Sequence, residues 1–158
     1  MRHRARRQCR RPGDHVDRWA DLGNLGGWTL KSLATAPNGW IYGVGTQGNV
    51  GIWTLGGWQT HDAPRGWAIE ALAWGPDGML YGVGIDGNVG IWSNNQWQDQ
   101  GNIGGWTLKM LAFDSAGRKY GVGTEGNIGR WNYPGWYDLG RYMGGWSMAW
   151  IHYAPIVA

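Results

Sequence analysis

Aligned with itself, this sequence repeats with a period of 39 residues. Tryptophans mark the period in two series, Trp19, Trp58, Trp97 and Trp136, and Trp28, Trp67, Trp106 and Trp146. The last step of the second series is one residue longer than the others. Self-similarity at a period of roughly 20–50 residues is typical of solenoids, propellers and related arrays. The chain is therefore an array of about three full units and one incomplete unit.

Each unit reads as four short strands separated by turns. In the first unit the turn signals are Asn38-Gly39, Gly48-Asn49 and Gly56-Gly57, and the fourth strand is Trp58-Gln-Thr-His. Glycine and asparagine adopt the positive φ angles that tight hairpin turns need, whereas each glycine inside a helix costs about 1 kcal/mol relative to alanine. Four strands in one unit match a propeller blade. We predict an all-β fold, a β-propeller or open partial propeller of about 3.5 four-stranded blades.

The strand count predicts that the chain does not close a ring by itself. Residues 19–25 are expected to form one outer strand and the segment from Trp146 one inner strand, which gives a total near fourteen strands with the three full units. An open arc leaves strand edges unpaired. We therefore expect a homo-oligomer, with two chains together supplying about seven blades, or a chain that is part of a longer protein. A monomeric open arc is the alternative.

The net charge of +3 divides the chain into two parts. Residues 1–18 hold seven Arg and two Asp, a net charge of +5, whereas residues 19–158 carry a net charge of −2. We expect 1–18 to be a disordered tail or an upstream stretch translated from a wrong start codon, and 19–158 to be the repeat domain. Nucleic-acid or anionic-membrane binding by the arginines stays an alternative, but the folded body is not expected to bind nucleic acid.

Two kinds of targeting segment are missing from the sequence. No apolar run approaches the ~18 residues of a membrane span, so no transmembrane segment is predicted. The tail has no apolar segment after its arginines, so it does not match a secretory signal. The residues leave the cellular location unassigned.

Two stretches, GGWTLKSLATAPNGWIYGVG and GGWTLKMLAFDSAGRKYGVG, resemble the repeat of the tachylectin-2-type propeller lectins. The later Gly-Val and Trp positions are similar to tectonin repeats. The resemblance covers residues 19–158, although the 39-residue period is shorter and the second unit has Arg65-Gly66-Trp67 in place of Gly-Gly-Trp. It implies a multivalent lectin for N-acetylated amino sugars such as GlcNAc or GalNAc, with a role in innate defence and secretion as in the family.

The repeated tryptophans raise the question of which set is core and which binds ligand. An indole buries a large apolar area and carries an N–H that needs a partner, so packing between blades explains one or two sets. The Gly-Gly-Trp set is our choice for a sugar platform, because small residues expose backbone N–H groups and Asn and Asp fix hydroxyls. The predicted binding residues are Asp21, Asn24, Gly27, Trp28, Trp67, Asp99, Asn102, Gly105, Trp106, Asp138 and Trp146.

The sequence motifs give no support for a catalytic or cofactor-binding function. Gly43-Val-Gly-Thr-Gln-Gly48 matches the dinucleotide fingerprint, as do its two repeats, but a strand rather than a helix is expected to follow each copy. No hydrolase or zinc-enzyme motif occurs, and one cysteine and four scattered histidines give no metal-site spacing. The shared position of Asp21, Asp99 and Asp138 fits a structural or a ligand-bonding role. We predict no enzyme activity, no cofactor and no metal.

Two other functional classes stay open. A propeller can be a protein–protein interaction scaffold without a small-molecule site. Identical exposed residues in every unit would favour a small ligand bound once per unit. In an interaction scaffold, the exposed residues are expected to differ between units. The remaining class is part of a larger quinoprotein-like enzyme, against which the absent cofactor signature argues.

Overall fold

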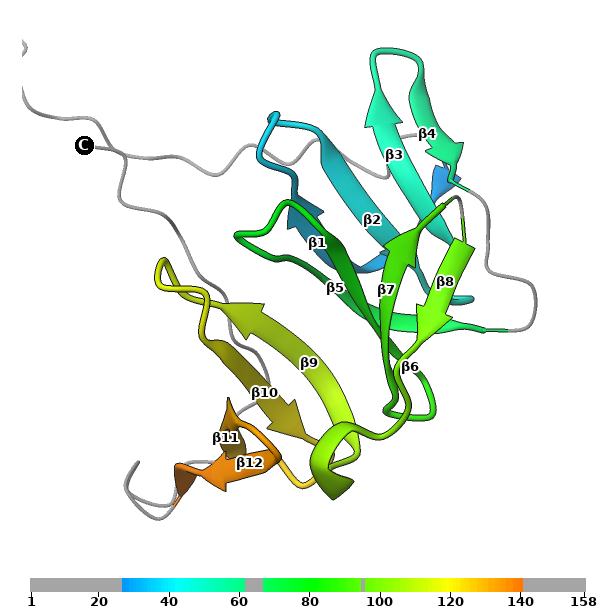
Figure 1. The fold of residues 1–158 in the computed structure, drawn as a ribbon. Coiled ribbons are helices and arrows are strands. Elements are labelled where there is room, and N and C mark those ends of the chain that lie inside the picture. Colours follow the sequence, from blue (N-terminus) through cyan, green and yellow to red (C-terminus); the bar gives the residue numbers. More distant parts are fainter. Residues whose placement is uncertain (1–26, 62–66, 95, 141–158) are drawn as a thin grey trace, which may run out of the picture.

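The computed structural model describes residues 27–61, 67–94 and 96–140 (Figure 1). Within these ranges the chain forms twelve strands and one 3-10 turn at Ile103–Gly105. Blade 1 contains β1 (Leu30–Thr35), β2 (Ile41–Gly45), β3 (Val50–Thr54) and β4 (Gly57–Thr60). Blade 2 contains β5 (Ile69–Trp74), β6 (Leu80–Gly84), β7 (Val89–Ser93) and β8 (Gln96–Asp99). Blade 3 contains β9 (Leu108–Phe113), β10 (Lys119–Gly123), β11 (Ile128–Asn132) and β12 (Gly135–Asp138).

Each blade is an antiparallel meander in which every strand pairs with the next one along the chain. The prediction of three complete four-stranded units is therefore confirmed. The tail at 1–18, the outer strand expected at 19–25 and the inner strand expected from Trp146 lie outside the described residues. The turn glycines behave as predicted, since Gly39, Gly48 and Gly78 all have φ near +80°.

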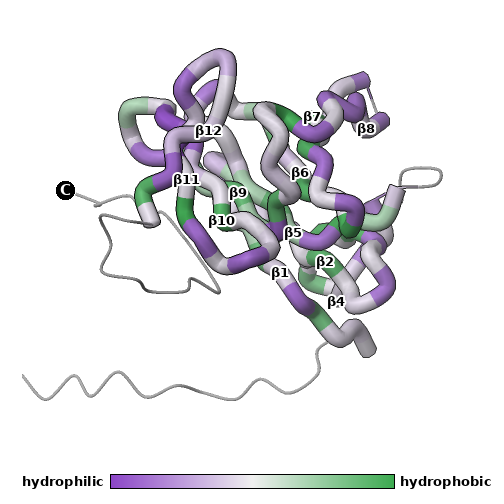
Figure 2. Tube along the Cα trace, turned by 90° about the horizontal axis from the view of Figure 1, so that it is seen from below, coloured by the Kyte–Doolittle hydropathy of each residue, from purple (hydrophilic) through white to green (hydrophobic). Residues whose placement is uncertain are grey.

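The innermost strands of consecutive blades lie side by side, with β5 between β1 and β9 (Figure 1). Two hydrophobic cores fill the spaces between the sheets. Val44, Val50 and Ile69 are fully buried between blades 1 and 2, and Val83 and Leu108 are buried between blades 2 and 3. Figure 2 shows hydrophobic segments along the strands where the sheets meet and hydrophilic segments on many of the turns. Burial of alternate strand residues between sheets is thus the main source of stability.

Backbone hydrogen bonds join each blade to the next one. The Ile69 N–H donates to Gly48 O at 3.0 Å, and the Leu108 N–H donates to Gly87 O at 3.2 Å. A Cβ added to Gly48, whose φ is +81°, would lie 2.7 Å from the Ala68 Cβ. Glycine is required here for two reasons, a left-handed backbone and close contact with the neighbouring blade. The last glycine of the first two G-x-G-x-x-G stretches is therefore a blade-docking residue. The strands β3, β7 and β11 that follow the three stretches contradict a dinucleotide site.

A second group of glycines lies inside the strands and faces tryptophans of the same sheet. A Cβ on Gly43 would lie 2.8 Å from the Trp58 ring, and one on Gly82 would lie 2.8 Å from the Trp97 ring. These strand glycines therefore do not face a neighbouring sheet. The bare backbone instead leaves room for an indole that lies flat on its own sheet.

Candidate functional site: the two ends of the blades

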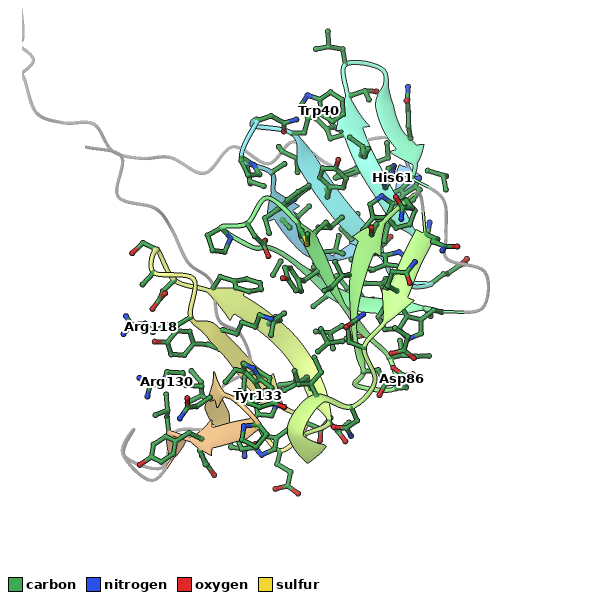
Figure 3. The ribbon with its side chains drawn as sticks, in the orientation of Figure 1. Trp40, His61, Asp86, Arg118, Arg130 and Tyr133 are labelled. Carbon is green, nitrogen blue, oxygen red and sulfur yellow. The ribbon has the colours of Figure 1, made fainter. Side chains whose placement is uncertain are left out.

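The chain reverses at every turn, so the connections fall at two ends of the blades. The Gly-Gly-Trp end holds the β2–β3, β6–β7 and β10–β11 turns and the segments that lead into β1, β5 and β9. The opposite end, here called the variable end, holds the β1–β2, β3–β4, β5–β6, β7–β8, β9–β10 and β11–β12 turns. Figure 3 shows Asp86 at the first end and Trp40 at the second, far apart in the molecule.

Most of the predicted sugar-binding residues lie at the Gly-Gly-Trp end, distributed over the three blades. The eight that the structure describes are Gly27, Trp28, Trp67, Asp99, Asn102, Gly105, Trp106 and Asp138. The other three, Asp21, Asn24 and Trp146, lie outside the described residues. The fold therefore brings the described residues to one end of the molecule, as separate clusters in successive blades.

The tryptophan of the Gly-Gly-Trp position packs against a second tryptophan of its own blade. Ring centroids are 6.1 Å apart for Trp28 and Trp58, and 5.7 Å apart for Trp67 and Trp97. The third blade repeats this contact between Trp106 and Trp136 at 6.1 Å. All three Gly-Gly-Trp indoles are half-buried. One face of each ring is thus occupied by protein.

Trp67 and Trp106 also border the cores between the blades. The Trp67 Nε1–H points to the Asp86 carboxylate, 3.4 Å from either oxygen. A further tryptophan of each blade, at the Trp53 position, packs on the second one, with centroids 5.4 to 5.5 Å apart. Each blade therefore contains a group of three tryptophans that covers its strand glycines, a structural role for all three sets.

The repeated aspartates organise turns. Asp99 Oδ1 accepts a hydrogen bond of 2.7 Å from the Gly101 N–H, and its Oδ2 lies 3.5 Å from Asn88 Nδ2. Asp138 Oδ1 likewise accepts a 2.7 Å hydrogen bond from the Gly140 N–H. An Asx turn of this kind holds the chain as it leaves the outer strand. Both side chains stay exposed, so oxygen lone pairs remain accessible to solvent.

The segment Asn102–Gly105 shows how one Gly-Gly-Trp loop is built. Trp136 Nε1–H donates to Ile103 O at 2.7 Å, which fastens the loop to the outer strand. Gly104 has φ +66°, and a Cβ there would lie 2.6 Å from the Trp131 ring. By contrast, Gly105 has φ +76° with open space beside it, and the exposed Asn102 side chain makes no capping hydrogen bond. Gly104 is therefore needed for close packing against Trp131, whereas Gly105 leaves the backbone accessible.

The variable end carries large exposed hydrophobic side chains that the sequence analysis did not single out. The exposed fractions are 108% for Leu55, 87% for Tyr133, 56% for Trp40 and 48% for Met79. Leu55 and Tyr133 lie in the last turns of blades 1 and 3, and Trp40 and Met79 follow the first turns of blades 1 and 2. The available sequence signal was that these positions differ between units, whereas the tryptophans do not.

Polar contacts hold the first turns of blades 2 and 3 at this end. The Tyr81 hydroxyl donates to Asp77 Oδ2 at 2.7 Å, and burial, together with this carboxylate, raises the pKa of Tyr81. In blade 3, Arg118 Nε donates to Asp114 Oδ2 at 2.5 Å. Desolvation of the Asp114 carboxyl acts to raise its pKa, but hydrogen bonds from the Arg118 backbone and guanidinium act in the opposite direction. The pKa of Asp114 is therefore lowered from its ordinary value.

The described part of the chain contains no cluster of three or more His, Cys, Asp or Glu able to hold a metal ion. It also contains no helix long and apolar enough to cross a membrane.

No protein-family model and no curated protein matches the sequence. Solved structures do match the fold. YCF48 bound to D1 peptide superposes with a TM-score of 0.57 at 17% identity, over 70% of this chain and 40% of that one. Virginiamycin B lyase from Staphylococcus aureus has a TM-score of 0.52 at 16% identity, over 68% of this chain and 39% of that one. YCF48 from Cyanidioschyzon merolae has a TM-score of 0.54 at 15% identity, over 70% of this chain and 40% of that one.

These neighbours are β-propeller proteins. The chain has the fold of a partial β-propeller. It matches about two-fifths of the length of each of these solved structures. At such low identity the likeness concerns the fold alone, and the resemblance to tachylectin-2-type and tectonin repeats stays a prediction from the sequence.

Proposed function

We propose that this protein is a non-catalytic β-propeller scaffold that binds a protein partner through its variable end. The observation that carries the proposal is a contrast between repeat-equivalent positions. Positions that pack inside the blades keep the same residue, as in the tryptophans at 53, 92 and 131. Two exposed positions at the variable end, those of Trp40 and Leu55, hold a different residue in each of the three blades.

Two sets of equivalent positions show this contrast. Trp40 and Met79 correspond to Arg118, and all three side chains are exposed. Leu55 corresponds to Asn94 and Tyr133, again all exposed. A small ligand bound once per blade needs the same side chains in each blade. One partner that spans several blades contacts each of them differently, so selection can diversify the contacts.

The chemistry of the variable end fits a protein surface. Aromatic residues, Met and Arg are enriched in protein interfaces. Asp77, Asp114 and Arg118 add polar groups around the apolar ones. The YCF48 structure that resembles this chain is bound to D1 peptide. That example supports a propeller of this shape as a peptide-binding scaffold.

Affinity purification with three baits tests the proposal. The wild-type chain is compared with L55S/Y133S at the variable end and with Q47S/I85S at the Gly-Gly-Trp end. We expect a partner that the wild type and Q47S/I85S retain at equal levels and that L55S/Y133S loses at least tenfold. Equal capture by all three baits would show that the variable end is not the binding surface.

Lectin activity is a second proposed function, and the open loop Asn102–Gly105 favours it. Asn102 presents a free amide beside the accessible backbone of Gly105 and the partly exposed Trp106. Such a group can hold a sugar hydroxyl or acetamido group next to an indole. N-acetylated amino sugars are the expected ligands, with one weak site per blade adding avidity.

A glycan array decides on this second function. We expect selective binding of GlcNAc- or GalNAc-terminated glycans by the wild type and a reduced signal for Asn102→Ala, whereas L55S/Y133S should bind as the wild type does. A flat signal across all glycans would remove the lectin proposal and leave the scaffold proposal standing.

A further inference from the structure

The β1–β2 turn of blade 1 holds the one Asn-Gly pair of the sequence, Asn38-Gly39. Both residues are exposed to solvent. The Asn38 Oδ1 accepts a hydrogen bond of 3.1 Å from the Trp40 N–H. This contact closes a ring of atoms that contains the side-chain amide carbon Cγ of Asn38 and the backbone nitrogen of Gly39. The side-chain amide therefore lies beside the peptide nitrogen of the next residue.

Glycine at position 39 leaves this backbone nitrogen accessible. Gly39 has φ +83°, and the space beside its Cα is open. Because glycine has no Cβ, no side chain hinders the approach of its nitrogen to the Cγ of Asn38. The Gly39 N–H donates to Ala36 O at 2.9 Å, so this hydrogen bond must open before the nitrogen reacts. Opening one hydrogen bond of an exposed turn is a local event that needs no separation of the blades.

The Trp40 N–H is placed to stabilise the charge that an attack on Asn38 develops. When a nucleophile adds to Cγ, the Asn38 Oδ1 becomes an oxyanion, and the Trp40 N–H already donates to that oxygen. A fixed N–H donor at a developing oxyanion lowers the barrier to acyl transfer. The turn thus combines a neighbouring nucleophile, Gly39 N, with a donor for the oxyanion.

We propose that Asn38 is a site of spontaneous deamidation, for which the turn itself supplies the nucleophile and the oxyanion donor. Hydroxide removes the Gly39 N–H proton, and the nitrogen forms a bond to the Cγ of Asn38. The Cγ–Nδ2 bond then breaks, and Nδ2 takes a proton from water and leaves as ammonia, which gives a five-membered succinimide. Water adds to one of the two ring carbonyls, and the C–N bond at that carbon breaks. Cleavage at Cγ gives aspartate, whereas cleavage at the main-chain carbonyl carbon gives isoaspartate.

Blade 2 shows how the aspartate product fits the turn. Asp77 has the repeat position of Asn38, and its Oδ1 accepts a hydrogen bond of 3.0 Å from the Met79 N–H. Its Oδ2 accepts a second hydrogen bond of 2.7 Å from the Tyr81 hydroxyl. Tyr42 is the equivalent of Tyr81 and is likewise buried. Aspartate at position 38 therefore keeps the backbone contact of the turn and gains an oxygen that accepts from the Tyr42 hydroxyl.

The two products differ in their effect on the protein. Aspartate adds one negative charge at the variable end, beside the exposed Trp40 (Figure 3), and preserves the turn. Isoaspartate lengthens the main chain by one methylene group, so the turn closed by the hydrogen bond from Gly39 N–H to Ala36 O no longer fits. The modification does not depend on partner or sugar binding, and only its effect on a bound partner rests on the proposed scaffold function.

Peptide mapping of the purified full chain by mass spectrometry, after incubation at pH 6 and at pH 8.5, tests the site. We expect aspartate plus isoaspartate at position 38 at least tenfold above the level at the exposed Asn102 and Asn132, which precede bulky residues. Conversion should be faster at pH 8.5, because hydroxide must remove the amide proton. Gly39→Ala is the matched control, and its Cβ should slow conversion at least tenfold. Equal conversion at position 38, Asn102 and Asn132 would overturn the proposal.

A synthetic peptide with the sequence of residues 34–42 separates reaction in the folded turn from reaction in an unfolded chain. The folded protein should convert at a rate within about tenfold of the peptide rate, since only a local hydrogen bond has to open. Conversion of the peptide alone would overturn the proposal, because the hydrogen bond from Gly39 N–H to Ala36 O would then protect the turn. Asn38→Asp should keep the circular dichroism and the urea midpoint of the wild type, and loss of fold would contradict the fit of the aspartate product.

Discussion

The Lys31 ammonium and the Glu70 carboxylate, which are repeat-equivalent residues 39 positions apart, form a 2.5 Å ion pair between the inner strands of blades 1 and 2. Both residues occupy a β-bulge, where one extra residue projects from the strand. Opposite charges at one repeat position thus link consecutive blades.

Breaking this pair should have a small effect. Lys31→Met or Glu70→Gln should each lower the free energy of unfolding by no more than about 1 kcal/mol, because both side chains are partly exposed to solvent. A double-mutant cycle measured by urea unfolding isolates the pair. The coupling should shrink in 0.5 M NaCl, and a coupling unaffected by salt would argue against an ion pair.

Gly48 should be much less tolerant of substitution than Gly39. The two residues have φ of +81° and +83°, but a Cβ meets Ala68 of blade 2 at Gly48 and open space at Gly39. We expect Gly39→Ala to cost about 1 kcal/mol of stability from backbone strain. Gly48→Ala should cost about 2–4 kcal/mol, because overpacking adds to that strain. Thermal unfolding of both variants measures the difference, and equal losses would contradict a blade-docking role.

Trp97 should be essential for stability. It is the second tryptophan of blade 2, in contact with both Trp67 and Trp92, and its ring covers Gly82. Trp97→Ala should destabilise the protein by about 3–5 kcal/mol through the cavity it leaves. Trp40→Ala removes the same side chain from an exposed site and should change stability by less than ~0.5 kcal/mol. Urea midpoints of the two variants provide the test.

Tyr81 should make stability depend on pH in the alkaline range. Burial and the Asp77 carboxylate raise the pKa of Tyr81 above its ordinary value of 10.0. The neutral phenol is therefore favoured in the folded state, so its contribution is fully present below pH 10 and is lost as the pH rises above that value. Tyr81→Phe keeps the ring against Phe113 but cannot ionise. Denaturant unfolding between pH 8 and 11 should show a steeper loss for the wild type than for the variant.

The repeat made much of the fold predictable. Equal spacing of Trp58, Trp97 and Trp136 indicated identical units, and glycines such as Gly39 and Gly78 marked turns that the structure confirms. Local chemistry was sufficient here, because a positive φ and a two-residue alternation are properties of short segments. The candidate site was less predictable. Trp67 and Asp99 were selected as ligand contacts, and the structure shows that they also have packing and turn-forming roles.

By itself the sequence determined the all-β class, the period, the turns and the four-stranded unit, because each follows from residues close together in the chain. Only the tertiary structure decided which side of each sheet is covered. Leu33, Leu72 and Leu111 are the same residue at the same repeat position, yet only Leu33 is exposed, since no described sheet packs on it. Likewise, the meander brings Trp40, Leu55 and Tyr133 to one end of the blades. Burial and shared surfaces arise between distant segments, so a repeat pattern that is identical in each unit does not specify them.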